Sequence, residues 1–148
     1  MEHLGVSALK PAGTAADFGP NFVFGTSTSA YQIEGAFRDE GKGLSTWDIF
    51  VRRPGAIENG DTGDRACDHY HRWEADLRLL AQLGAEAYRF SISWPRVLPD
   101  GVGRIIESGL DFYDRLVDRL CEYGIRPFAT LFHWDLPLAL EEIGRAHV

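Results

Sequence analysis

The stretch AYRFSISWP, residues 87 to 95, alternates apolar and polar side chains and then stops at a proline. The apolar set is Tyr88, Phe90 and Ile92, and the polar set is Arg89, Ser91 and Ser93. A period of two is typical of a β-strand, and the residue before a proline disfavours a helical backbone. We therefore predict a strand over residues 87–93 that ends at Trp94-Pro95.

A helical pattern lies on each side of this strand. From about Cys67 to Leu83, and again from about Glu107 to Tyr123, apolar residues recur at spacings of three and four, as on one face of a helix. The first set is Tyr70, Trp73, Leu77 and Leu80, and the second is Leu110, Tyr113, Leu116, Val117 and Leu120. Gly84 and Gly124 stand where C-terminal caps belong, so each helix is predicted to stop there.

Two further strands complete the pattern. Residues 22–25 are an apolar run that leads into the small residues 26–30, which indicates the end of a strand followed by tight backbone, and Arg126 to Phe132 is a third apolar run. Strands that alternate with helices form a parallel sheet. The predicted fold class is therefore α/β.

Polar and aromatic side chains follow each predicted strand. They are Gln32 and Glu34 after the first, Trp94 after the second, and His133, Trp134 and Asp135 after the third. The carboxyl ends of parallel strands meet at one edge, so these groups should share one rim. Amides, imidazoles and carboxylates suit sugar hydroxyls, and indoles pack on the apolar faces of sugar rings. Taken alone, each residue is more often a satisfied core residue than a ligand contact.

Composition excludes several classes of function. The chain has 148 residues, 45% of them hydrophobic, and a net charge of −7. Its calculated pI is about 5.1, so nucleic acid and anionic membranes are not expected partners. No apolar stretch approaches the roughly 20 residues of a membrane span, and no targeting signal is recognisable, so we expect a cytoplasmic protein.

The two cysteines, Cys67 and Cys121, have neither metal-ligand nor disulfide spacing. We expect both to be small core residues in a reducing cytoplasm. No metal or other cofactor is predicted. Residues 1–18 are expected to be a flexible N-terminal segment.

Five stretches, in this order and spacing, resemble the N-terminal third of glycoside hydrolase family 1. They are FVFGTSTSAYQIEGA (22–36), GDTGDRACDHYHRW (60–73), AYRFSISWPRVLP (87–99), GLDFYDRLVDRL (109–120) and PFATLFHWDLP (127–137). The resemblance covers residues 19–141. It implies a (β/α)8 TIM barrel, of which this chain contains the first three strands and two complete helices, and a retaining β-glycosidase, most plainly a β-glucosidase.

The resemblance also implies roles for particular residues. Gln32 and His133 match the family's residues that hold hydroxyls of the terminal non-reducing sugar, and Trp134 lines the same subsite. Arg89 matches the arginine that keeps the catalytic nucleophile ionised, because a nearby positive charge lowers a carboxyl pKa. Glu34 and Asp135 are expected to support backbone and loops. Independently of the resemblance, Asp64 and Asp68 are expected to cap the helix that begins near residue 67.

The two catalytic glutamates that the family uses are missing from the 148 residues. The family places its acid/base in an Asn-Glu-Pro motif and its nucleophile in a Thr-Glu-Asn-Gly motif, and neither occurs here. Ile57 to Gly60, IENG, comes nearest, but it lies in a polar loop before a helix, so we interpret it as loop. The chain alone is therefore expected to be inactive. Ile106 stands where the family usually has asparagine, which should alter the start of the following helix.

The last residues suggest an artefact. Glu142 to Val148, EIGRAHV, can be encoded by a common sequencing-adapter sequence read in frame, so we expect them to be an artefactual tail. An alternative to an incomplete β-glucosidase stays open, namely a sugar-binding or half-barrel module that needs a second chain. In the barrel, Phe24, Tyr88, Phe90, Phe128 and Leu131 are expected to face inward.

Overall fold

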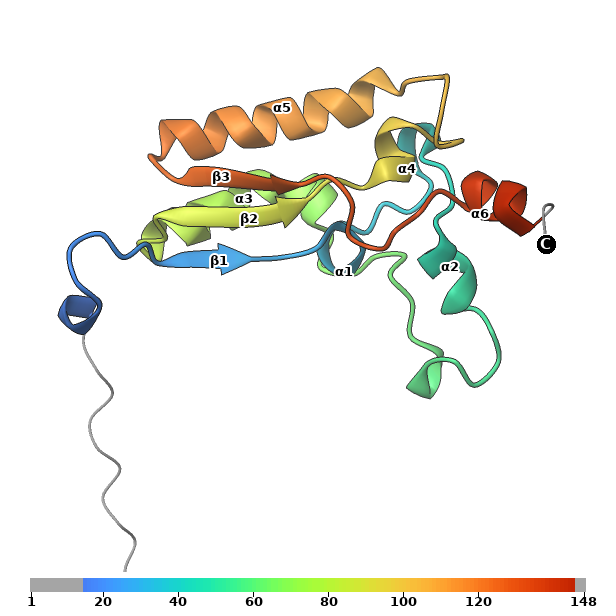
Figure 1. The fold of residues 1–148 in the computed structure, drawn as a ribbon, viewed down its shortest axis with the longest axis horizontal. Coiled ribbons are helices and arrows are strands. Elements are labelled where there is room, and N and C mark those ends of the chain that lie inside the picture. Colours follow the sequence, from blue (N-terminus) through green and yellow to red (C-terminus); the bar gives the residue numbers. More distant parts are fainter. Residues whose placement is uncertain (1–14, 146–148) are drawn as a thin grey trace, which may run out of the picture.

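The computed structural model describes residues 15–145 of the chain, and its side chains from 17 to 141. Three parallel strands form one sheet in the order β1 (Gly25–Ser27), β2 (Ala87–Ser91), β3 (Arg126–Thr130). All three arrows in Figure 1 point toward α1 (Ala30–Ile33) and α4 (Trp94–Val97). The carboxyl ends of the strands therefore meet at one edge, and the predicted α/β architecture is confirmed.

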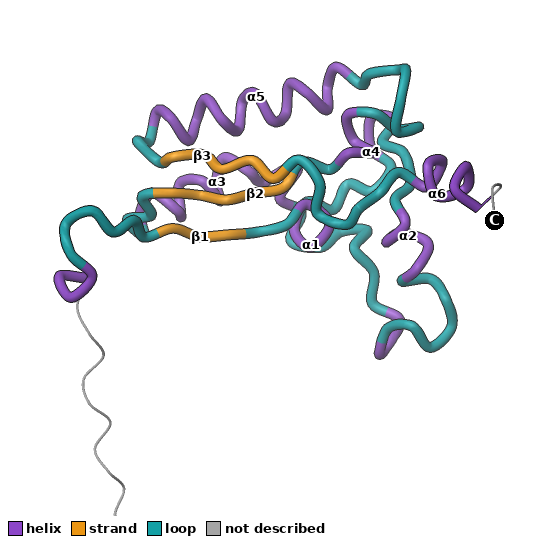
Figure 2. Tube along the Cα trace, in the orientation of Figure 1, coloured by secondary structure: helices purple, strands orange, loops and turns teal. Residues whose placement is uncertain are grey.

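The two long helices are α3 and α5, and the connections contain shorter turns. Their bounds are η1 (Ala15–Phe18), η2 (Asp39–Gly41), α2 (Thr46–Phe50), η3 (Glu58–Gly60), α3 (His69–Gln82), α5 (Glu107–Glu122) and α6 (Leu138–Arg145). Figure 2 shows that the segment between α1 and α3 makes a long, mostly irregular excursion beyond the ends of the strands. This excursion supplies part of the candidate site described below.

Both long helices end at the predicted glycines. Gly84 has a φ of 72° and Gly124 a φ of 69°, a left-handed backbone that glycine adopts without steric cost. After α3, the amide of Gly84 bonds the carbonyl of Ala81 and the amide of Ala85 bonds that of Leu80. The same pattern follows α5. These are Schellman caps, which satisfy helix carbonyls that would otherwise lack partners.

The hydrophobic core lies between one face of the sheet and the two long helices. Its buried members are Trp73, Leu77, Tyr88, Phe90, Phe112, Tyr113, Leu116, Leu120 and Ile125. Tyr88 and Phe90 therefore face the helices, and the expectation that they face the barrel interior is wrong. Side chains alternate along a strand, so placing Arg89 on one face requires its two neighbours to lie on the other.

The opposite face of the sheet is open. Arg89 of β2 pairs in register with Phe128 of β3, and both side chains are exposed. Phe128 thus lies on the expected inner face. Leu131 does not, because it lines an apolar groove on the helix side together with Ala129 and Tyr113.

The first strand begins later than predicted. The run 22–25 contributes only Gly25 to β1, while Phe22 and Phe24 pack their rings with Phe18 at centroid distances of 4.8 to 5.4 Å. This aromatic cluster precedes the strand, so Phe24 does not face a barrel interior either. β3 likewise ends at Thr130, two residues before the predicted end at Phe132.

Several local expectations can be compared with the structure. Cys67 and Cys121 are exposed, so their predicted core placement is wrong. Asp68 precedes α3 but makes no capping bond with its side chain, which bonds His71 instead, and Asp64 pairs with Arg52, so neither caps the helix.

Two other expectations concern the loop at residues 57–60 and the start of α5. The IENG stretch lies in a loop as predicted, with a short η3 turn at Glu58–Gly60. Helix α5 begins at Glu107, and Ile106 at its N-cap makes no side-chain capping bond. The helix thus begins without a side-chain cap, and an effect of the missing asparagine on its start stays a prediction.

Residues 1–14 and 146–148 lie outside the described residues, which include most of the expected flexible segment and the end of the expected tail. Both expectations stay predictions. Within residues 15–145, no helix is both long and apolar enough to cross a membrane.

Candidate functional site

A cleft of about 290 Å³ brings together three of the residues that were predicted to bind sugar. Gln32 comes from α1, and His133 and Trp134 come from the turn after β3. Although about 100 residues separate them in sequence, parallel strands deliver them to the same edge. The remaining lining residues are Ser29, Tyr31, Trp47, Val51 and Ile57.

The amide of Gln32 is held in place by a neighbour. Ser29 Oγ donates to Gln32 Oε1 over 2.8 Å, and the side chain is exposed. Both hydrogens of the amide group then remain available to an acceptor in the cleft. The helix α1 that carries Gln32 is anchored because the amide of Ala30 donates to the buried hydroxyl of Ser91 on β2, at 2.7 Å.

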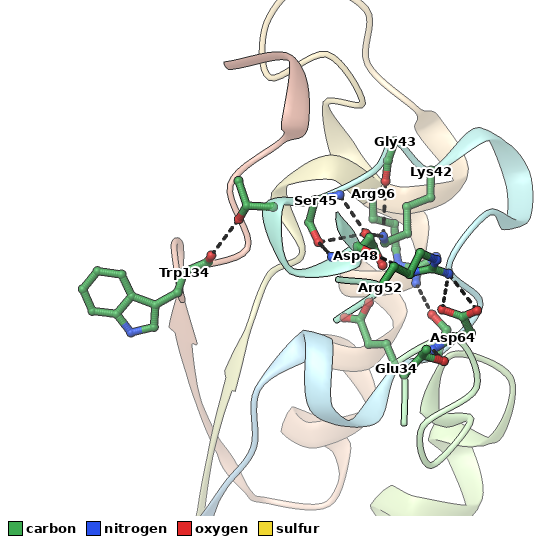
Figure 3. A network of polar contacts seen from close by, with 12 residues as sticks. Glu34, Lys42, Gly43, Ser45, Asp48, Arg52, Asp64, Arg96 and Trp134 are labelled. Carbon is green, nitrogen blue, oxygen red and sulfur yellow. Dashed lines mark hydrogen bonds and ion pairs between the residues drawn. The ribbon is translucent and has the colours of Figure 1, made fainter. Parts of the chain in front are cut away.

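His133 and Trp134 occupy a strained turn. Trp134 has a φ of 73°, a left-handed conformation that is uncommon for a bulky residue. Its indole is 70% exposed, and Figure 3 shows it extending away from the buried polar network. The Nδ1 atom of His133 is buried and has no hydrogen-bond partner among the described residues. The cleft is therefore lined by an apolar indole face and by an imidazole whose Nδ1 atom is buried away from solvent.

The segment around α2 is hydrogen-bonded to this turn and to the residues that follow it. The amide of Thr46 donates to the carbonyl of Leu136, and the amide of Leu138 donates to that of Leu44, both at 2.8 Å. Thr46 Oγ1 also donates to the carbonyl of Trp134 over 3.4 Å. The start of α2 is itself held by a reciprocal capping box between Ser45 and Asp48.

Arg89 lies on the open face of the sheet and is not among the residues that line the cleft. Its Nε donates to Thr130 Oγ1 on the neighbouring strand over 2.9 Å. The guanidinium is exposed, and no described carboxylate pairs with it in an ion pair. Its remaining donors are thus free to meet an anionic group that approaches from the open face.

Glu34 and Arg96 form a buried ion pair and do not line the cleft. Arg96 Nε donates to Glu34 Oε2 over 2.9 Å, and the Tyr113 hydroxyl donates to Glu34 Oε1 over 2.6 Å. Burial first, and then the charge of Glu34, raise the pKa of Tyr113 well above its ordinary value. Glu34 therefore supports the fold from within, in agreement with its expected supporting role.

A second buried pair is Lys42 with Asp48, at 3.5 Å, and Figure 3 shows it beside the first. Burial lowers the pKa of Lys42, and the charge of Asp48 opposes this effect. Asp135 is also buried, at 2% exposed, and its burial raises its pKa to about 6. Neither of its carboxylate oxygens has a hydrogen-bond partner among the described residues.

One predicted rim residue lies elsewhere. Trp94 lines the apolar groove beside α5, and its indole nitrogen donates to the carbonyl of Gly101 over 3.2 Å. Conversely, Trp47 was not among the predicted site residues, but it lines the cleft and its ring stacks on that of Tyr31 at a centroid distance of 5.9 Å. The S-x-x-D pattern of a capping box, Ser45 to Asp48, was the signal that could have located its helix.

Among the described residues, no group of three histidine, cysteine, aspartate or glutamate side chains is arranged to hold a metal ion. Glu58 of the IENG stretch does not line the cleft, although its neighbour Ile57 does. What the cleft offers is a set of hydrogen-bonding groups beside indole faces at the carboxyl edge of a parallel sheet. Groups of these kinds are chemically suited to bonding hydroxyls and to packing on apolar ring faces.

Comparison with known proteins identifies the class. The sequence profile described as Glycosyl hydrolase family 1 matches residues 14–147, and the chain belongs to this family. The thermostable beta-glucosidase B of Thermobispora bispora is 54% identical over 140 residues, which are 95% of this chain and 29% of that protein. The coniferin beta-glucosidase of Pinus contorta is 54% identical over 126 residues, 85% of this chain and 25% of that protein.

Solved structures agree with these sequence matches. A family 1 beta-glucosidase from Thermotoga maritima matches with a TM-score of 0.83 and 55% identity, over 84% of this chain and 29% of that one. The same enzyme in complex with noeuromycin matches equally well. The chain thus has the fold of the first part of a (β/α)8 barrel, and it spans less than a third of the length of these relatives.

Proposed function

We propose that this chain forms the sugar-binding N-terminal part of a retaining β-glucosidase that releases terminal non-reducing β-D-glucosyl residues. The observation that carries the proposal is the cleft in which Gln32, His133 and Trp134 meet. Relatives that are 54 to 55% identical and are named β-glucosidases support the choice of substrate class.

Each residue has a separate task in this proposal. The Gln32 amide and the His133 imidazole bond sugar hydroxyls, while the Trp134 indole covers an apolar ring face. Arg89 faces the barrel interior and lowers the pKa of a nucleophilic carboxylate brought by another strand. Retaining hydrolysis needs two carboxyl groups about 5 to 5.5 Å apart, and we propose that the rest of the barrel supplies both.

The remaining partners follow from the same chemistry. The ligand is a β-glucoside or a β-linked oligosaccharide, and the reaction needs no cofactor because two carboxyl groups suffice. The negative charge of the chain, −7, argues against nucleic acid and anionic membranes as partners. A cytoplasmic location belongs to the proposal as well, and two exposed cysteines without a disulfide are compatible with a reducing compartment.

A grafted enzyme tests the proposal. Residues 19–141 replace the matching segment of the Thermotoga maritima beta-glucosidase, which is 55% identical, to give a full-length barrel. This grafted barrel should hydrolyse an aryl β-glucoside. Gln32→Ala and His133→Ala should each raise the barrier in kcat/KM by roughly 2 to 4 kcal/mol, because bonds that strengthen in the transition state are lost.

Gln82→Ala is the matched control, since Gln82 is also an exposed glutamine but lies at the end of α3, away from the cleft. Its kinetics should equal those of the unsubstituted graft. A folded graft without β-glucosidase activity would refute the proposal, and unchanged kinetics in both cleft variants would show that these residues do not bind the substrate.

A second candidate function is a half-barrel module that pairs with a separate chain. An apolar groove of about 460 Å³ beside β3 and α5 favours it, because exposed apolar surfaces of this kind often mark the site where another polypeptide packs. Co-expression of the chain with the remaining part of the Thermotoga maritima enzyme tests this alternative. Activity in the mixture, and in neither part alone, would support it.

A further inference from the structure

Two indoles that line the cleft come from segments far apart in sequence. Trp47 belongs to α2, and Trp134 belongs to the turn after β3. Neither segment fixes the other through the local chain, because more than half of the described residues lie between them. The position of one indole relative to the other therefore depends on the contacts that join the two segments.

The two segments are joined by a short stretch of antiparallel backbone pairing. Its centre is a bridge between Ser45 and Pro137, and two backbone hydrogen bonds of 2.8 Å flank it. Thr46 Oγ1 adds the bond to the carbonyl of Trp134. Ser45 thus stands where the segment that carries Trp47 meets the segment that carries the turn.

The carboxylate of Asp48 holds Ser45 in this place. In a bridge whose flanking residues make the hydrogen bonds, the amide of the central residue points away from the partner segment and needs another acceptor. Asp48 Oδ2 is that acceptor, at 2.7 Å from the amide of Ser45, and it also accepts from Ser45 Oγ over 2.8 Å (Figure 3). Ser45 is 1% and Asp48 0% exposed, so water does not replace these bonds.

The negative charge of Asp48 has a cation of its own. Lys42 Nζ lies 3.5 Å from Asp48 Oδ2, and the lysine side chain is 7% exposed. The same Nζ donates to the carbonyl of Gly43 over 3.2 Å. A buried carboxylate with a paired cation and further donors is held in one orientation. One oxygen atom of Asp48 thus faces three donor groups, two from Ser45 and one from Lys42.

We infer that Asp48 is a positioning residue, which fixes Ser45 at the bridge and so sets how Trp47 stands relative to the turn that presents His133 and Trp134. This inference rests on the proposed function, because the arrangement of the indoles matters for catalysis only if the cleft binds the sugar. Asp48 itself does not line the cleft, so it acts through Trp47 and not by touching the substrate.

The test uses the grafted barrel with two variants of Asp48. Asp48→Ala removes the acceptor, whereas Asp48→Asn keeps an oxygen that can accept from Ser45 but loses the charge that faces Lys42. Asp48→Ala should raise KM for an aryl β-glucoside about fivefold while kcat changes by less than about twofold, because an indole packs on the sugar in the ground state and in the transition state alike. Asp48→Asn should raise KM about twofold, as expected for partial rescue by a weaker, neutral acceptor.

A double-mutant cycle shows whether Asp48 acts through Trp47. Trp47→Ala should raise KM by itself, and adding Asp48→Ala to it should raise KM little further, because the indole that Asp48 positions is already absent. A residue that only stabilises the fold would instead give effects on KM that multiply.

Asp76→Ala is the control, because Asp76 is a partly buried carboxylate that bonds His69 within α3 and does not line the cleft. It should lower the thermal stability of the graft and retain its KM. Thermal unfolding establishes that each variant is folded, and if Asp48→Ala does not fold, the KM of Asp48→Asn decides.

Three results would overturn the inference and leave the β-glucosidase proposal intact. They are an unchanged KM in every folded Asp48 variant, an unchanged KM in Trp47→Ala, and effects of the two alanine substitutions that multiply in the cycle. A folded graft without activity would instead overturn the proposed function, and this inference with it.

Discussion

The buried charge of Asp135 makes a prediction about stability that is independent of catalysis. Its pKa in the folded protein, about 6, lies above the ordinary value of 3.8. Folding is therefore favoured by protonated Asp135, and this contribution is fully present below pH 3.8 and is lost as the pH rises through 6. At the residue scale, the ionised carboxylate of Asp135 therefore lowers the stability of the fold at neutral pH.

Asp135→Asn should accordingly stabilise the grafted barrel at pH 7, by at most roughly 2 to 3 kcal/mol, because about two pKa units of unfavourable ionisation are removed. At pH 4 the gain should vanish. Thermal unfolding of both proteins at the two pH values measures this. A variant that is less stable at pH 7 would show that the ionised carboxylate stabilises the fold.

Glu34 should behave in the opposite way, because it is buried with a cation. Glu34→Gln leaves the Arg96 guanidinium, 2% exposed, without its counter-charge. Removing one partner of a buried pair costs about 3 to 5 kcal/mol. Denaturant unfolding of the grafted barrel should show this loss. The control is Asp64→Asn, whose partner Arg52 is exposed, and for which little change is expected.

At the scale of elements, the ends of the helices depend on backbone conformation more than on side-chain contacts. A Cβ atom added at Gly84 would meet no atom within 4 Å, so only its φ of 72° opposes substitution. Gly84→Ala should therefore destabilise the grafted barrel by about 1 to 2 kcal/mol, the cost of a left-handed residue. Gly84→Asn should cost less, because asparagine tolerates this conformation. Equal losses in the two variants would contradict a conformational cause.

The strands follow a different rule. Period two identifies β2 correctly, but which face is buried depends on α3 and α5, whose residues are far away in sequence. The run 22–25 is equally apolar and yet forms an aromatic cluster before β1. A short apolar run has no periodicity that separates a strand from other packing, which is why this boundary was wrong.

At the scale of the whole molecule, the sequence contains the proposed sugar-binding residues but neither catalytic glutamate motif. We can therefore predict the activity of the chain alone. Purified residues 1–148 should not hydrolyse an aryl β-glucoside above background, because neither glutamate motif is present in this sequence. A sensitive fluorogenic assay with the grafted barrel as positive control measures this. Reproducible turnover that disappears in a Glu58→Gln variant would contradict the assignment of the IENG stretch to a loop.

The isolated chain should also pack poorly. Phe128 is 54% and Leu131 75% exposed, and β1 and β3 each have only one neighbour among the described strands. Exposed apolar faces and unpaired edges promote association. We expect helical circular dichroism together with broad amide resonances and aggregation. A monodisperse monomer with one sharp thermal transition would contradict this and would favour the independent module.

The sequence by itself determined the features that depend on neighbouring residues. Helical periodicity located α3 and α5, two glycines marked their ends, and the order of strands and helices predicted that Gln32 and His133 would meet at one edge. These signals are local because helix geometry and caps involve residues within a few positions of one another. The motifs of the family then indicated the barrel and its sugar site.

Only the tertiary structure decided which side of each element is buried. It placed Tyr88 and Phe90 against the helices, moved Trp94 into the groove beside α5, and buried Asp135 beside two ion pairs that were already complete. The burial of a side chain depends on contacts between segments that are many residues apart. Local sequence patterns do not indicate these contacts. The balance of the buried charges follows from the same contacts, so the burial of Asp135 beside Glu34 and Lys42 became visible only in three dimensions.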